Sequence, residues 1–155
     1  MPHKFTQSEC ESAFLANPIL CDFISCALQD AQLTEADEAC MEQRDKRDSG
    51  TIYTLPAETF LKLQTIAARF AVECFEHIES ATDLEPGDDG FRYAKEYMTH
   101  SRIGSTLWLA VTGSGVTFTD DGSAPCLIAM ADWANGLHVE SLYFGDDGEM
   151  YLMGN

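Results

Sequence analysis

The stretch LPAETFLKLQTIAARFAVECFEHIES, from Leu55 to Ser80, decides the fold of the chain. Pro56 and Glu58 suit a first helical turn, because proline needs no amide partner there and the helix dipole favours a carboxylate. Apolar residues then recur at helical spacing, which predicts one face turned to the core. They are Phe60, Leu63, Ile66, Ala67, Phe70, Cys74 and Ile78. The stretch therefore predicts a long central helix.

A second amphipathic stretch, NPILCDFISCALQDAQL (17–33), precedes the first. Asn17 suits a helix cap and Pro18 the first helical position, and the apolar residues that follow keep helical spacing. We therefore predict another helix here. The intervening TEADEACMEQRDKRDSG (34–50) is mixed in charge and has few large apolar residues, so it suits either a solvated helix or a loop.

The periodicity changes in the last part of the chain. DLEPGDDG (83–90) ends the helical pattern, and FRYAKEYMTHSR (91–102) suits a short helix. STLWLAV (105–111) and VTFT (116–119) are rich in residues favoured in strands, and the TGSG between them suits a hairpin turn. APCLIAMADWANG (124–136) predicts a helix that begins near Pro125 and ends at Asn135 and Gly136. LHVESLYF (137–144) and EMYL (149–152) predict a second hairpin.

These patterns predict an α+β fold, in which N-terminal helices pack on a small antiparallel sheet and the C-terminal half has the order ββ-α-ββ. We expect one domain over residues 1–155, with a helical part at about 7–101 and a ββαββ part at about 105–153. Five residues should share one core with the central helix: Trp108, Phe118, Trp133, Leu142 and Phe144.

Asp146 and Asp147 lie in the Gly-Asp-Asp-Gly of the second hairpin, where they could turn the chain or bind a cation. A calcium loop of the EF-hand type needs carboxylates at alternating positions and a later Glu, and GDDGEM does not supply this pattern. Asp and Gly are favoured in turns for backbone reasons, and Asp-Asp-Gly recurs at 88–90 and 120–122. We therefore predict turns and no metal site.

The net charge is far from zero. The chain has 9 Lys and Arg against 26 Asp and Glu, so 9 − 26 = −17. Such a charge repels nucleic acid and anionic lipid, and we expect neither direct nucleic-acid binding nor membrane association. A binding partner should instead be basic, and basic proteins are often proteins that grip phosphate backbones.

The acidic residues are unevenly distributed. Between Arg69 and Arg92 there are seven carboxylates and no Lys or Arg, and after Arg102 there are seven more acids and no basic residue. Such rows can imitate the phosphates of a duplex, which predicts that the first set binds the partner; the alternative is an acidic face that only keeps the protein soluble. The predicted binding residues are Glu73, Glu76, Glu79, Asp83, Glu85, Asp88 and Asp89.

The residues of chemical interest show no catalytic pattern. The four histidines lie in different segments, and none stands in a nucleophile motif; the GSG at 113–115 is followed by a predicted strand where a phosphate-binding loop needs a helix. The six cysteines lack zinc spacing, and we interpret them as reduced thiols in a cytoplasmic protein without a signal peptide or membrane span. No catalytic residue and no cofactor are predicted.

LWLAVTGSGVTFTDD (107–121), followed after one helix by VESLYFGDDGEMYL (139–152), resembles the C-terminal half of a family of short acidic phage and prophage proteins. The helices predicted at 17–33 and 55–80 are similar to that family's first and middle helices. Family members often carry Asn-Gly-His-Gly where this chain has Thr112-Gly113-Ser114-Gly115. The resemblance implies a phage or mobile-element origin and a small α+β fold, and it brings no catalytic residues.

The leading functional hypothesis is a non-enzymatic phage-type accessory protein that acts in the host cytoplasm. It would bind a basic host protein that handles nucleic acid, such as a CRISPR or restriction component, by charge mimicry. The alternatives are an oligomeric structural protein and a small enzyme or ligand-binding protein with a pocket around Trp108 and Trp133. A concave site lined by a His and a carboxylate would favour the enzyme or ligand-binding alternative.

Overall fold

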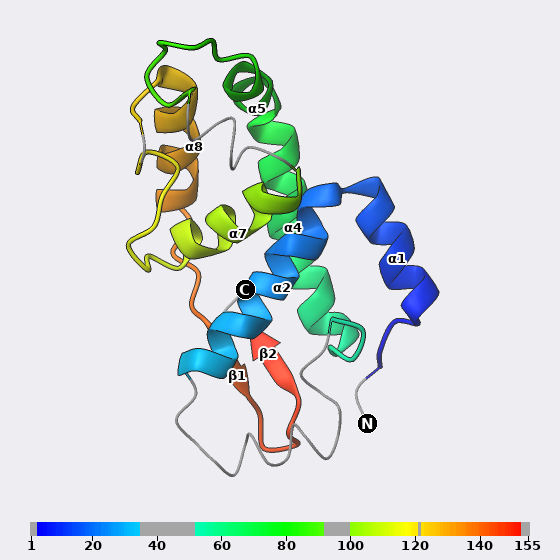
Figure 1. Cartoon of the computed structure of the whole chain (residues 1–155). Coiled ribbons are helices and arrows are strands. Elements are labelled where there is room, and N and C mark those ends of the chain that lie inside the picture. Colours follow the sequence, from blue (N-terminus) through cyan, green and yellow to red (C-terminus); the bar gives the residue numbers. More distant parts are fainter. Residues whose placement is uncertain (1–2, 35–51, 92–99, 121, 153–155) are drawn as a thin grey trace.

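A computed structural model describes residues 3–34, 52–91, 100–120 and 122–152 (Figure 1). Over these residues the helices are α1 (Gln7–Ala16), α2 (Pro18–Thr34), α4 (Ala57–Glu73), α5 (Phe75–Thr82), α7 (His100–Val111) and α8 (Pro125–Asn135). The strands are β1 (Leu142–Phe144) and β2 (Met150–Leu152). The predicted α+β class is confirmed, and helices dominate. The interpretation of 34–50 and most of the predicted helix at 91–102 lie outside the described residues.

Three of the predicted helices are confirmed with small changes. The Asn17 side chain accepts a hydrogen bond from the Ile19 amide at 3.2 Å at the start of α2, and α8 spans the predicted residues. The predicted central helix is present as two helices, because Cys74 (φ −105°, ψ 14°) leaves the helical conformation between α4 and α5. The chain therefore bends at a residue that the apolar periodicity alone does not mark.

The predicted first hairpin is wrong. STLWLAV lies in α7, and residues 112–119 form turns and irregular backbone. Ile103, Leu107 and Val111 are buried at a spacing of four residues, which puts them on one helical face. Packing against α2 thus outweighs the local preference of Trp, Thr and Val for strands.

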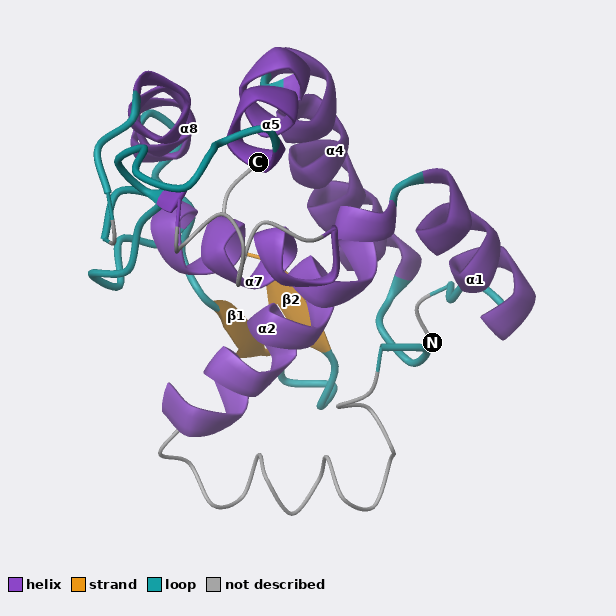
Figure 2. Ribbon diagram, turned by 45° about the horizontal axis from the view of Figure 1, so that its top comes forward, coloured by secondary structure: helices purple, strands orange, loops and turns teal. Residues whose placement is uncertain are grey.

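The second hairpin is confirmed with a shorter first strand, because β1 covers only Leu142–Phe144 of the predicted 137–144. β1 and β2 are antiparallel with Leu142 opposite Leu152 and Phe144 opposite Met150. The Thr59 hydroxyl of α4 donates to the Met150 carbonyl at 2.8 Å, and the hairpin packs against α2 and α4. Figure 1 shows this two-stranded sheet beside α2 in the lower part of the molecule, and in Figure 2 it lies behind α2. The C-terminal half is therefore a helix pair followed by one hairpin, and the ββ-α-ββ order does not occur.

The five aromatic and apolar residues expected to share a core do so. Trp108, Phe118 and Leu142 are buried in one cluster with α2 and α4, and Trp133 and Phe144 pack on it while partly exposed. The Trp108 ring meets Phe23 of α2 edge to face, at 5.5 Å between centroids. The core therefore joins α2, α4, α7 and α8 around two aromatic contacts, the second being the 5.6 Å stack of Phe70 and Phe118.

Gly104 sits where α7 crosses α2. A Cβ at this position would overlap the Ile19 carbonyl oxygen and the Phe23 amide nitrogen, so only glycine allows this approach. Beside it, the Asp22 carboxylate accepts hydrogen bonds from the Ser105 amide and hydroxyl, each at 2.7 Å. The crossing is thus fixed by shape and by a charge-assisted pair of hydrogen bonds.

Candidate functional site

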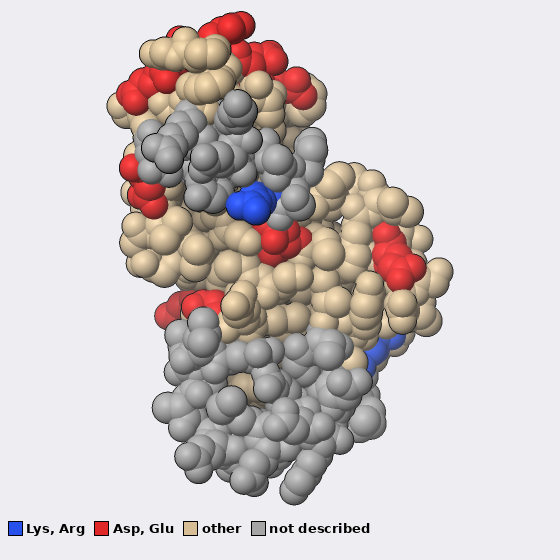
Figure 3. Space-filling view, in the orientation of Figure 1, with Lys and Arg blue, Asp and Glu red and all other residues tan. Residues whose placement is uncertain are grey.

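The seven predicted binding residues form what we call the acidic cap: Glu73, Glu76, Glu79, Asp83, Glu85, Asp88 and Asp89. They lie at the end of α4, along α5 and in the turn after it, and all seven are exposed. Figure 3 shows acidic side chains gathered at the end of the molecule formed by α5 and this turn, while the Lys and Arg atoms on this face lie further down. The structure therefore brings the cap residues to one end of the molecule.

Glu73 is the cap residue nearest to α8. It pairs with Arg69 at 3.2 Å and accepts a hydrogen bond from the Trp133 indole at 3.2 Å. The indole hydrogen bond, with a smaller contribution from Arg69, lowers the pKa of the Glu73 carboxyl. Arg69 also lies over the Trp133 ring, at 5.8 Å from its centroid. This end of the cap is held in place by α8.

Asp88 and Asp89 hold the turn after α5. Asp88 accepts a hydrogen bond from the Glu85 amide at 2.7 Å, and Asp89 accepts from the Ser123 amide at 3.0 Å and hydroxyl at 2.7 Å. The bonds from Ser123 lower the pKa of the Asp89 carboxyl. The cap is therefore joined to the segment before α8, and Asp89 keeps its charge in moderately acidic solution.

The glycines of two Asp-Asp-Gly motifs meet at this junction. Gly90 and Gly122 approach so closely that a Cβ on Gly122 would overlap the Gly90 backbone, and a Cβ on Gly90 would overlap the Leu127 side chain. Gly90 also has φ +88°, which disfavours other residues. The prediction that these motifs are turns is confirmed for Asp88 to Gly90, and the contact between them explains why glycine recurs.

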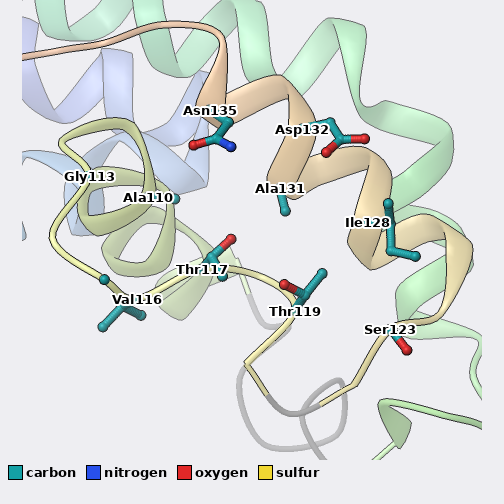
Figure 4. Close-up of a pocket in the computed structure, with 11 residues that line it drawn as sticks. Ala110, Gly113, Val116, Thr117, Thr119, Ser123, Ile128, Ala131, Asp132 and Asn135 are labelled. Carbon is teal, nitrogen blue, oxygen red and sulfur yellow. The ribbon is translucent and has the colours of Figure 1, made fainter.

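An open cavity of about 540 Å³ lies beside the cap, between residues 113–123 and α8. Figure 4 shows Ala131 pointing from α8 toward this segment, and Thr117 pointing back toward the helix. We call it the α8 cleft; its lining also includes Ala110, Gly113, Gly115, Val116, Thr119, Ser123, Ile128, Asp132 and Asn135. Ser123 lines the cleft and donates to Asp89, so cleft and cap adjoin.

A smaller cavity of about 230 Å³ continues from the cleft. The two share Ala110, Gly113 and Asn135, and the smaller one is also lined by His138 and Glu140. His138 has φ +50°, an uncommon conformation for a residue with a side chain. The sequence predicts no site at these residues, because His138 and Glu140 are not part of a recognisable motif.

The two tryptophans do not line the cavities described above. Trp108 is fully buried, and its indole donates to Asp30 at 3.1 Å; Trp133 donates to Glu73. Neither lines the α8 cleft or the smaller cavity. The predicted pocket around the two tryptophans therefore does not match the α8 cleft. The cleft is lined by Asp132 and Asn135, which lie on the same helix as Trp133.

The Gly-Asp-Asp-Gly of the second hairpin forms a turn, as predicted. Asp147 accepts a hydrogen bond from the Glu149 amide at 2.9 Å, and Gly148 has φ +79°. The Tyr151 hydroxyl donates to Asp147 at 2.6 Å, and this bond raises the pKa of Tyr151 to about 12. Among the described residues, no group of three or more His, Cys, Asp and Glu is arranged to hold a metal ion.

The cysteines in the described part of the chain are free thiols: Cys10, Cys21, Cys26, Cys74 and Cys126. Burial raises the pKa of the Cys74 thiol to about 11, so it stays protonated at neutral pH. Cys40 lies outside the described residues. These thiols act as small buried or half-buried apolar groups, apart from the exposed Cys21.

Comparison of the chain with models of protein families, with curated proteins and with solved structures finds no match. None of the helices in the described ranges combines the length and the apolar character needed to cross a bilayer.

Proposed function

We propose that this protein is a non-enzymatic accessory protein of phage type whose acidic cap binds a basic protein of the host that handles nucleic acid. The cap supplies rows of carboxylates on a folded surface, as a duplex supplies phosphates. A restriction or CRISPR component fits this description. Such a protein binds nucleic acid through a basic surface, and a phage benefits when that surface is blocked. The likeness of the sequence to short phage proteins supports this origin.

The observation that carries the proposal is where the cap carboxylates lie on their helices. Glu79 and Asp83 lie at the end of α5, and this helix has no basic residue in its last turn. The negative end of a helix dipole repels carboxylates, at a cost of a few tenths of a kcal/mol each. Solubility alone does not require acids at these positions, whereas a binding surface at this end of the molecule does.

The hydrogen bonds within the cap favour binding. Asp88, Asp89 and Glu73 each accept from a fixed donor, so their carboxylates are ordered before a partner arrives. An ordered charge loses less side-chain entropy on association. The cap therefore suits specific recognition better than a set of freely moving acidic side chains.

A cavity lined by His138 and Glu140 is the observation that favours the alternative of an enzyme or ligand-binding protein. Nucleophilic catalysis requires a hydroxyl or thiol hydrogen-bonded to the histidine. The hydroxyl of Thr112, which lines this cavity, donates instead to the Trp108 carbonyl at 2.8 Å. We propose a binding role for this cavity.

The proposal is tested by capture from host lysate on the immobilised chain. A basic protein should be retained, should elute as the salt concentration rises, and should be displaced by duplex DNA, because exposed charge pairs are screened within about 8 Å at physiological ionic strength. Salt elution without displacement by DNA would indicate an acidic interface that does not imitate a duplex. Retention that ignores both salt and DNA would contradict the proposal.

A further inference from the structure

The α8 cleft exposes large apolar side chains on both of its walls. Val116 is 39% exposed on the segment before α8, and Ile128 is 41% exposed on α8 itself. Figure 4 shows Val116 and Ile128 at opposite ends of the cleft. Exposed apolar groups that line a cavity are typical of a surface that another molecule covers. The cleft volume of about 540 Å³ is large enough for several side chains of a partner.

The charge of the cleft selects the kind of partner. Asp132 lines the cleft and Glu140 lines the cavity that continues it, and the described residues of both linings include no Lys or Arg. The sequence after Arg102 has no basic residue. The carboxylates of Asp132 and Glu140 therefore attract a cation and repel an anion.

The polar groups of the cleft suit a peptide backbone. Thr117, Thr119, Ser123 and Asn135 bring hydroxyl and amide groups to the same walls as Val116 and Ile128, and these groups can donate to carbonyls and accept from amides. An extended segment presents alternating side chains together with unpaired backbone groups. A small cation would use the carboxylates and leave the apolar walls uncovered.

We propose that the α8 cleft and its continuation bind an extended basic segment of the partner, with Lys or Arg side chains beside Asp132 and Glu140 and separate apolar side chains against Val116 and Ile128. The inference rests on the proposed function, because it supplies a second contact for the same basic partner. The cleft adjoins the acidic cap at Ser123, so one partner can reach both surfaces. The cap then accelerates the encounter, and the cleft slows dissociation.

The test uses a synthetic extended peptide of alternating Arg and Leu and follows the backbone amide signals of the full isotope-labelled chain by NMR. Binding should shift signals of 113–119 and of α8, including those of Ile128 and Asp132. A matched peptide with Glu in place of Arg should not bind. If free arginine binds as tightly as the peptide, the cleft is a site for a small cation, and the proposal of an extended segment is wrong.

Two variants locate the binding. Ile128→Lys should weaken the Arg-Leu peptide at least about tenfold, because it places a cation in the cleft and removes the apolar contact. Leu61→Lys is the matched control, since Leu61 is 47% exposed on α4 and lines neither cavity; it should bind as the wild type does. If the peptide still binds Ile128→Lys but no longer binds when the charges of cap residues are reversed, the cleft is not the binding site. The proposed function of the cap would not be affected by that result. Failure of the proposed function would show separately, as capture that ignores salt and DNA.

Discussion

Two half-buried carboxylates in this protein accept hydrogen bonds from neutral donors. Asp22 accepts from Ser105, and Asp30 accepts from Trp108 and Ser141, whereas the buried Glu149 pairs with Lys4 at 3.0 Å. With only nine Lys and Arg for 26 acids, the chain can neutralise only some of its carboxylates with ion pairs. Hydroxyl, indole and amide donors stabilise a carboxylate without adding positive charge. The protein therefore keeps its net charge while fixing individual side chains.

At this scale the first prediction concerns Trp108, which is fully buried against Phe23. Trp108→Ala should lower the free energy of unfolding by roughly 3–5 kcal/mol, because it leaves a cavity in the core. Trp108→Phe keeps most of the apolar contact and removes the bond to Asp30, so its loss should be smaller. Denaturant unfolding followed by circular dichroism measures both. An alanine variant as stable as the wild type would place Trp108 outside the core.

The second prediction concerns the pH dependence of the hairpin. The bond to Asp147 raises the pKa of Tyr151 to about 12 from 10.0, so its contribution to stability is present below pH 10 and is lost as the pH rises toward 12. In Asp147→Asn the pKa of Tyr151 should fall back, measured by tyrosinate absorbance and assigned by comparison with Tyr151→Phe. Asp146→Asn is the control and should leave the titration unchanged. Equal titrations in Asp147→Asn and the wild type would rule out the bond.

At the scale of elements, the sequence predicts helices better than it predicts the region around Trp108. The helical character of 57–82 and the hairpin at 142–152 are visible in their apolar periodicity and turn residues, because both signals are local. α7 is not, since its helical conformation depends on packing against α2 at Gly104, a contact between distant parts of the chain. The cleft could not be predicted from the sequence either. Its lining residues Val116 and Ile128 belong to separate segments that come together only in the folded chain.

The third prediction tests the crossing of α2 and α7. Gly104→Ala should destabilise the fold by about 1–3 kcal/mol or more, because the added methyl group overlaps backbone atoms of Ile19 and Phe23, which cannot move aside like a flexible side chain. Gly136→Ala is the matched control. Gly136 has an ordinary φ of −78°, and the atom nearest to an added Cβ would be the Trp133 carbonyl oxygen at 3.6 Å. Thermal unfolding of the two variants measures the difference. Equal melting temperatures would mean that the helices do not approach as closely as described.

At the scale of the whole molecule, charge and packing are separated. The aromatic core joins α2, α4, α7 and α8, and the acidic cap lies at the end of the molecule formed by α5 and the turn after it. The seven cap residues could be selected from the sequence, because no Lys or Arg lies among them between Arg69 and Arg92. Their ordering by Trp133 and Ser123 could not, because these donors come from residues that lie near the cap only after folding.

The proposed function rests most directly on the position of charge, which one kinetic measurement isolates. In one variant Glu79, Asp83 and Glu85 of the cap are changed to Lys; Asp88 is kept because it accepts from the Glu85 amide. In the control, three acids outside the cap, Glu11, Glu58 and Asp146, are changed to Lys. Both variants have a net charge of −17 + 6 = −11. Any difference between them therefore reports location and not total charge.

The association rate constant with the captured basic protein is then measured at several salt concentrations. We predict that the cap variant associates at least about tenfold more slowly than the control at low salt and that the difference shrinks as salt rises, because steering depends on local unscreened charge. Its melting temperature should be unchanged or slightly higher, since repulsion within the cap falls. Equal association rates for the cap variant and the control would contradict the account and leave the acidity as a device for solubility.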